Sequence, residues 1–144
     1  MKTLMVLLLS AVALLGSPAV ANTTDYKQSK VKILERIIDL TKEVNTSLSR
    51  DLFVADVKDL VGDCGNKFFC KVHNVLGNQE NVTKGPAKIV RQLTQFNLHQ
   101  HVNCKELLKG MNSTRTKIQM PEFMKSLIDC CKERIFNMDK NVNA

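Results

Sequence analysis

The stretch that decides the fold is Thr116-Lys117-Ile118-Gln119-Met120-Pro121-Glu122-Phe123-Met124-Lys125-Ser126-Leu127, near the end of a chain of 144 residues. Its first part alternates, with Ile118 and Met120 on one side, which is typical of a short strand. Pro121 then suits the first turn of a helix, where its missing N–H costs nothing. One face of that predicted helix is apolar and carries Phe123, Met124, Leu127, Ile128, Cys131, Ile135 and Met138.

Three more helical patterns precede this stretch. The first spans 25–49, where apolar residues recur at steps of three and four: Val31, Leu34, Ile37, Ile38, Thr41, Val44 and Leu48. The second spans 66–76 and ends at Gly77-Asn78. The third begins at Pro86 and extends toward Val102, with a stripe of Ile89, Val90, Leu93, Phe96 and Asn97. Residues 104–113 form a weaker amphipathic segment.

The connection over 50–65 lacks a helical period, and we expect an extended segment with one short strand. A second short strand is expected just before the last helix. These two strands can pair only if both long connections cross the bundle. The pattern therefore favours an all-α fold, a short-chain four-helix bundle with up-up-down-down order, long crossovers and a short two-stranded β ribbon, over the simple up-down bundle.

The first 21 residues are typical of a cleaved signal peptide. Lys2 is followed by an apolar run from Leu4 to Leu15, and Ala19-Val20-Ala21 fits the small-residue cleavage rule. The run is shorter than the roughly 18 residues that a membrane span needs. We therefore expect a single secreted, extracellular domain over 22–144, without membrane insertion.

Composition excludes several function classes. The formal net charge is +7, but only 5% of residues are aromatic and none is Trp, so stacking residues for nucleic acid are scarce. The phosphate-binding, dinucleotide-binding and zinc-protease motifs are all absent. His99 and His101, two positions apart on a helix, would diverge by about 200°. We expect no metal site, no cofactor and no enzymatic activity.

Five cysteines follow the predicted signal peptide: Cys64, Cys70, Cys104, Cys130 and Cys131. In an oxidising compartment two disulfides and one leftover thiol are expected. Cys131 falls near the centre of the last helix's apolar arc, so it is the candidate free thiol, whereas Cys130 at the edge is the candidate bridge partner. Four bonded cysteines still permit three connectivities. Four N-x-S/T sequons mark candidate glycosylation sites, all expected to face solvent: Asn22, Asn45, Asn81 and Asn112.

The chain resembles the interleukin-4/interleukin-13 family of short-chain four-helix cytokines, including the joint interleukin-4/13 form of teleosts. The quoted stretch matches the family's T-K-I-x-x-x-x-F-x-K-x-L strand and fourth helix. The other three helices are matched, in the family's order, by Leu34–Ile38, by Phe69-Cys70 with Val75-Leu76, and by Val90–Phe96. By position the resemblance implies a Cys70–Cys104 bridge. It leaves Cys64–Cys130 as the second bridge, with Cys64–Cys131 as the alternative.

The resemblance also implies receptor contacts. In the family a first-helix Glu and a third-helix Arg form the charged centre of one receptor contact. Arg91 matches the Arg, while the Glu position aligns with Arg36, beside Glu35. A solvated helix face is the alternative for Glu35 and Arg36. The second receptor chain would meet the last helix at Lys132, Asn137 and Lys140, and the strand edge formed by Thr116, Lys117, Ile118 and Gln119.

We therefore expect a monomeric secreted cytokine that bridges two type I cytokine receptor chains to start type-2 immune signalling. One chain would be interleukin-4 receptor alpha-like, and the other common gamma-like or interleukin-13 receptor alpha-like. A cationic host-defence or glycosaminoglycan-binding protein is the alternative. Lys and Arg are spread over all four helices and never form a run of five, which argues against a membrane-active face but allows a glycosaminoglycan contact.

Overall fold

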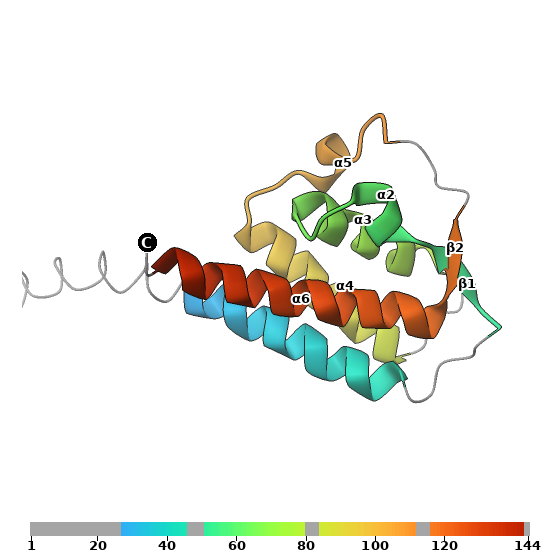
Figure 1. Cartoon of the computed structure of the whole chain (residues 1–144), viewed down its shortest axis with the longest axis horizontal. Coiled ribbons are helices and arrows are strands. Elements are labelled where there is room, and N and C mark those ends of the chain that lie inside the picture. The colour runs from blue at the N-terminus through green and yellow to red at the C-terminus, as the bar shows by residue number, and fades with distance from the viewer. Residues whose placement is uncertain (1–26, 46–50, 80–83, 112–115, 143–144) are drawn as a thin grey trace, which may run out of the picture.

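The computed structural model describes residues 27–45, 51–79, 84–111 and 116–142. This part of the chain is mostly helical, with one small two-stranded antiparallel sheet (Figure 1). The long helices are residues 27–45, α3 (Asn66–Gly77), α4 (Lys84–His99) and α6 (Met120–Val142). The shorter elements are β1 (Phe53–Ala55), α2 (Val57–Val61), α5 (Cys104–Leu107) and β2 (Lys117–Gln119). The predicted signal peptide lies outside the described residues.

The sheet joins the two long connections of the chain. β1 pairs antiparallel with β2, with Val54 opposite Ile118. Two hydrogen bonds extend the ladder beyond the strands: Asp56 N–H donates to the Thr116 carbonyl at 3.0 Å, and Met120 N–H donates to the Leu52 carbonyl at 2.9 Å. The prediction that these two distant stretches pair is confirmed.

All four long helices contribute side chains to one apolar core. Phe69 of α3 is completely buried in this core, with its ring centroid 4.8 Å from that of Phe96 and 5.3 Å from that of Phe68. Complete burial of a phenylalanine side chain contributes about 1.5–3 kcal/mol to stability. The remaining fully buried large side chains are mainly aliphatic, with one further ring and one thioether: Phe123, Leu34, Ile37, Leu76, Ile89, Leu93, Met124, Leu127 and Val57.

The helix of residues 27–45 buries the predicted stripe. Thr41 is fully buried among aliphatic side chains, and its hydroxyl donates to the Ile37 carbonyl one turn earlier. Leu40 is also buried, although the predicted stripe omits it. The apolar face is therefore wider than a strict three-four spacing indicates.

The segment 50–65 departs from the extended form that we expect from its sequence. Only Phe53–Ala55 is a strand, and Val57–Val61 forms the helical turn α2. Asp56 caps this turn by accepting a hydrogen bond from Asp59 N–H at 3.2 Å. Gly62 ends it in a left-handed conformation with φ of 84°, which glycine adopts without steric cost. Local capping thus shortens the extended part.

Helix ends also shift by small amounts. α4 begins at Lys84, two residues before Pro86, and α6 begins at Met120, one residue before Pro121. α4 stops at His99 rather than reaching Val102, because the chain turns through His101, whose φ is +54°.

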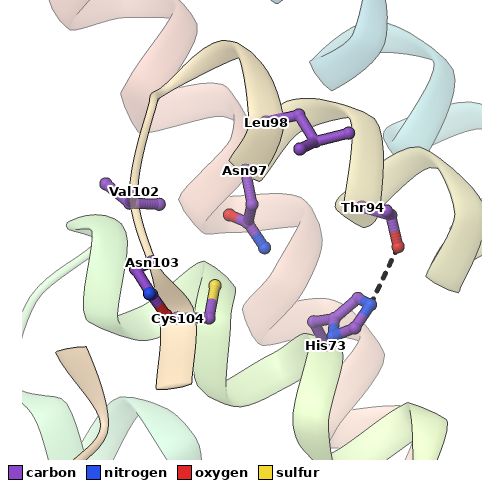
Figure 2. A pocket seen from close by; sticks show the side chains of 7 residues that line it. All are labelled: His73, Thr94, Asn97, Leu98, Val102, Asn103 and Cys104. Carbon is purple, nitrogen blue, oxygen red and sulfur yellow. Dashed lines mark hydrogen bonds between the residues drawn. The ribbon is translucent and has the colours of Figure 1, made fainter. Parts of the chain in front are cut away.

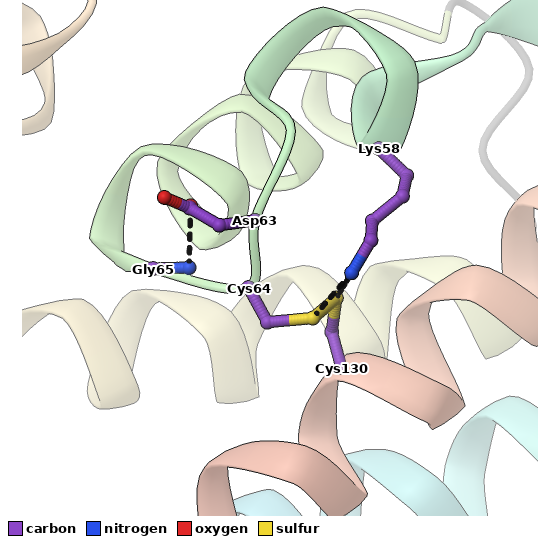
Figure 3. Close-up of a disulfide and its surroundings, with 5 residues drawn as sticks. All are labelled: Lys58, Asp63, Cys64, Gly65 and Cys130. Carbon is purple, nitrogen blue, oxygen red and sulfur yellow. Dashed lines mark hydrogen bonds between the residues drawn. A yellow bond between two sulfur atoms is a disulfide. The ribbon is translucent and has the colours of Figure 1, made fainter.

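Two disulfides fasten the short elements to the long helices. Cys64–Cys130 joins the turn before α3 to α6, and Cys70–Cys104 joins α3 to α5. The Cys70–Cys104 bridge is the one that the resemblance implied, and of the two alternatives for Cys64 the structure has Cys130. Cys131 is a buried free thiol, as predicted from the helix pattern. Figure 3 shows Lys58 beside the first bridge, with Nζ 2.9 Å from Cys64 Sγ and 3.7 Å from Cys130 Sγ.

Candidate functional site

A small hollow of about 200 Å³ lies between the helix of residues 27–45 and α4. We call it the basic groove, and its lining residues are Arg36, Leu40, Lys88, Arg91 and Gln92. Arg36 and Arg91 are both exposed, whereas Leu40 is buried beneath them. The groove therefore has an apolar floor and a cationic rim.

Helical spacing explains why these side chains meet. Arg36 and Leu40 are four residues apart and so share one side of their helix. On α4, Lys88 and Arg91 are three residues apart, while Ile89 faces the core. Packing of the two helices then brings one cation from the first helix beside two from α4.

The charges in the basic groove all have one sign. Three of its five lining residues are cationic, and none of the described residues that line it is acidic. An arginine guanidinium presents a planar fork of N–H donors that matches a carboxylate or a sulfate. The groove is therefore suited to bind an anionic group.

Glu35 does not line the basic groove. It is exposed on the same helix as Arg36 but is rotated about 100° from it. Of the two neighbouring first-helix residues Glu35 and Arg36, only Arg36 lies in the groove with Arg91. Arg36 and Arg91 are thus two cations, not the oppositely charged pair that the resemblance implied.

The predicted strand site lies on β2. Thr116 and Lys117 are exposed, while Ile118 and Gln119 are half-buried. The ladder bonds at Thr116 and Met120 mean that the backbone groups of Lys117 and Gln119 point away from β1. One edge of β2 is thus paired, and the other faces outward.

The predicted residues on the last helix are only partly described. Lys132 and Asn137 are exposed on α6, while Lys140 belongs to α6 but its side chain lies outside the described residues. Between them Phe136 is 65% exposed, and sequence analysis missed it as a surface feature. The sequence contains a signal for this exposure, because Phe136 falls outside the apolar stripe of its helix and so on the side expected to face solvent.

Arg134 is a second residue that sequence analysis missed, and its role is structural. Its guanidinium lies 6.0 Å from the Phe69 ring centroid and 5.8 Å from that of Phe96. Burial lowers its pKa, against the opposing influence of Asp63 and Glu133. A cation over two aromatic faces fixes α6 against α3 and α4.

The sequons are mostly beyond what the structure describes. Asn22, Asn81 and Asn112 lie outside the described residues. Asn45 is the last described residue of the first long helix, where it is half-buried and its Oδ1 is enclosed without a hydrogen-bond partner in the described part of the chain. The amide is therefore less open to solvent than we expect for a glycosylation site.

Comparisons of this chain with protein-family models, curated proteins and solved structures find no match. Within the described ranges, no helix combines the length and the apolar character needed to cross a bilayer. The same part of the chain contains no cluster of three or more His, Cys, Asp or Glu side chains arranged to hold a metal ion.

Proposed function

We propose that the protein is a secreted cytokine of the interleukin-4/13 type that bridges two receptor chains. The observation that carries the proposal is the basic groove, where Arg36 from the first long helix meets Arg91 from the third. These are the positions at which the resemblance implies the centre of a receptor contact. Arginine is also among the residue types most enriched at interface hot spots.

A four-helix bundle with up-up-down-down order is part of this proposal. In Figure 1 the helix of residues 27–45 and α3 run from left to right, and α4 and α6 run from right to left. Burial lowers the pKa of Lys30, and the nearby charge of Arg134 lowers it further, so the start of the first helix lies near the later part of α6. Pairing of β1 with β2 supports two long crossovers, because it joins the two connections that such an order requires.

The proposed mechanism is approximation of two receptors without chemistry on the protein itself. The basic groove would bind acidic side chains of an interleukin-4 receptor alpha-like chain. The outward edge of β2 and the α6 surface of Lys132, Phe136 and Asn137 would bind the second chain, either common gamma-like or interleukin-13 receptor alpha-like. The formal charge of +7 becomes +6 when Lys2 is removed with the signal peptide, and this positive charge would speed encounter with an acidic receptor surface.

Secretion is inferred from the sequence of residues 1–21 and fits the two disulfides, which persist in oxidising compartments. The cationic alternative makes a different prediction. A glycosaminoglycan-binding protein would bind heparin or anionic vesicles and lose that binding in salt, without binding any receptor ectodomain.

The test is a binding panel of type I cytokine receptor ectodomains with Arg91→Glu and a matched control. Lys105→Glu reverses the same charge on exposed α5, away from the groove. We expect nanomolar binding to one ectodomain, with Kd raised by about 30-fold or more in Arg91→Glu, the cost of an interface hot spot. The control should bind as the unaltered protein does, and both variants should keep the helical circular dichroism.

Equal losses in the two variants would mean that net charge, rather than the basic groove, drives binding. Binding to heparin alone, with no ectodomain bound at micromolar concentration, would favour the cationic alternative and refute the cytokine proposal.

A further inference from the structure

A second hollow, of about 380 Å³, lies between α3, α4 and the segment that leads from α4 into α5. We call it the His73 hollow. Figure 2 shows the residues that line it, which are His73, Thr94, Asn97, Leu98, Val102, Asn103 and Cys104. It shares no residue with the basic groove. The Cys70–Cys104 bridge fastens one wall of the hollow to α3.

Asn97 is the unusual residue of this hollow. Its side chain is only 6% exposed, and its Oδ1 is buried with no hydrogen-bond partner among the described residues. Figure 2 shows the amide pointing into the space between Val102, Cys104 and His73. A buried acceptor without a donor lowers stability, so Asn97 Oδ1 is suited to accept a hydrogen bond from a donor outside the described residues.

Two other polar groups of the hollow, His73 Nε2 and Thr94 Oγ1, already have partners. Thr94 Oγ1 donates its proton to the Val90 carbonyl at 3.0 Å, so at 2.9 Å it accepts the proton of His73 Nε2. Burial lowers the pKa of His73, which keeps the ring neutral near pH 7. No lining residue is otherwise charged at that pH. The missing donor therefore belongs to a neutral group.

The remaining walls are apolar and open on one side. Leu98 is 61% exposed at the rim, and Val102 lines the opposite side. A cavity of about 150 Å³ holds a benzene ring, so this hollow has room for an aromatic side chain. Small-molecule sites usually enclose 70–90% of their ligand, whereas this hollow is a surface depression with exposed Thr94 and Asn103.

We propose that the His73 hollow receives the phenol ring of a tyrosine from a partner protein, with the phenol O–H donating to Asn97 Oδ1. Tyrosine combines an apolar ring with one neutral donor at its tip, and it is enriched at protein interfaces. Leu98 and Val102 would contact the two sides of the ring. The inference is independent of the receptor proposal, because it concerns a different surface.

The test uses p-cresol, the side chain of tyrosine, with toluene as the matched ring that lacks the donor. Nuclear magnetic resonance shifts of the disulfide-intact protein should give a Kd on the order of 1–10 mM for p-cresol, as expected for so few atoms. The shifted signals should be those of His73, Thr94, Asn97 and Leu98. Toluene should bind at least tenfold more weakly.

Two variants make the same chemical change inside and outside the hollow. Asn97→Leu should reduce p-cresol affinity to that of toluene, whereas Gln95→Leu, on the exposed side of α4, should change nothing. Gly-Tyr-Gly should cause the same shifts as p-cresol and Gly-Phe-Gly should not, which distinguishes a protein side chain from a free phenol.

The proposal fails if p-cresol and toluene bind the unaltered protein equally, or if the shifts map elsewhere. This comparison needs no variant and so holds even if Asn97→Leu does not fold. Undiminished p-cresol binding by a folded Asn97→Leu variant would also overturn the assignment of the acceptor. If p-cresol binds but Gly-Tyr-Gly does not, the inference that the ligand is a tyrosine of a partner protein is overturned.

Discussion

Removal of the Cys64–Cys130 bridge tests how the fold is stabilised. The double variant Cys64→Ala/Cys130→Ala opens a loop whose ends are 66 residues apart in the sequence. In the chain-entropy account, a loop of this length contributes about 4.3 kcal/mol by restricting the unfolded chain. Domains of this size are stable by about 5–15 kcal/mol, so the variant would lose a large share of its stability.

The second bridge provides an internal control. Cys70–Cys104 spans 34 residues, for which the same account gives about 3.8 kcal/mol. Loop length alone should therefore make the losses of unfolding free energy in the two double variants differ by only about 0.6 kcal/mol. Cys64 and Cys130 are both buried, whereas Cys104 is half-buried, so lost packing should add to the cost of the first variant.

Urea unfolding followed by circular dichroism measures both losses, and the slope of the transition reports any change in the unfolded state. A loss below about 1 kcal/mol for Cys64→Ala/Cys130→Ala would refute the reasoning. So would a loss for Cys70→Ala/Cys104→Ala that is larger by several kcal/mol, because loop length and burial both predict the opposite order.

Three further changes test local features. Burial lowers the folded pKa of His73 below its ordinary value of 6.5, so the unfolded chain takes up this proton first and stability falls as pH drops below about 6.5. His73→Gln should flatten that fall in urea midpoints measured between pH 7.5 and 5, and an unchanged profile would contradict the assignment. Gly62→Ala should cost about 1 kcal/mol because φ is +84°, whereas Gly77→Ala, at the end of α3 with open space around it, should cost nothing or stabilise, as thermal unfolding would show. Burial raises the pKa of the fully buried Cys131 thiol, so iodoacetamide at pH 8 should leave it unmodified in the folded protein, and rapid alkylation under native conditions would mean that α6 opens.

The long helices and the pairing of the two strands could be predicted from sequence because their signals are periodic. The stripe from Phe123 to Met138 repeats over several turns, so the period is unambiguous. α2 was missed because it has five residues and its signals are only Asp56 at one end and Gly62 at the other. A single turn has no period to detect.

The candidate site was less predictable, because it depends on packing between helices. Resemblance pointed to Arg91 and Arg36 separately, but only the packed helices bring them together with Lys88 in one groove. Asn97 was recognised as part of a buried stripe. That its Oδ1 would lack a partner depends on the positions of His73 and Val102, which come from other segments.

The pairing of early and late segments has a consequence for how the chain is made. β1 and Cys64 have no native partner until β2 and Cys130 have been synthesised, whereas Cys70 finds Cys104 earlier. Before that point Cys64 can oxidise only with Cys70 or Cys104, and both choices are non-native and must be reversed by slow disulfide exchange. The late-synthesised segment of residues 117–130 therefore determines whether the segment containing β1 and Cys64 can reach its final arrangement.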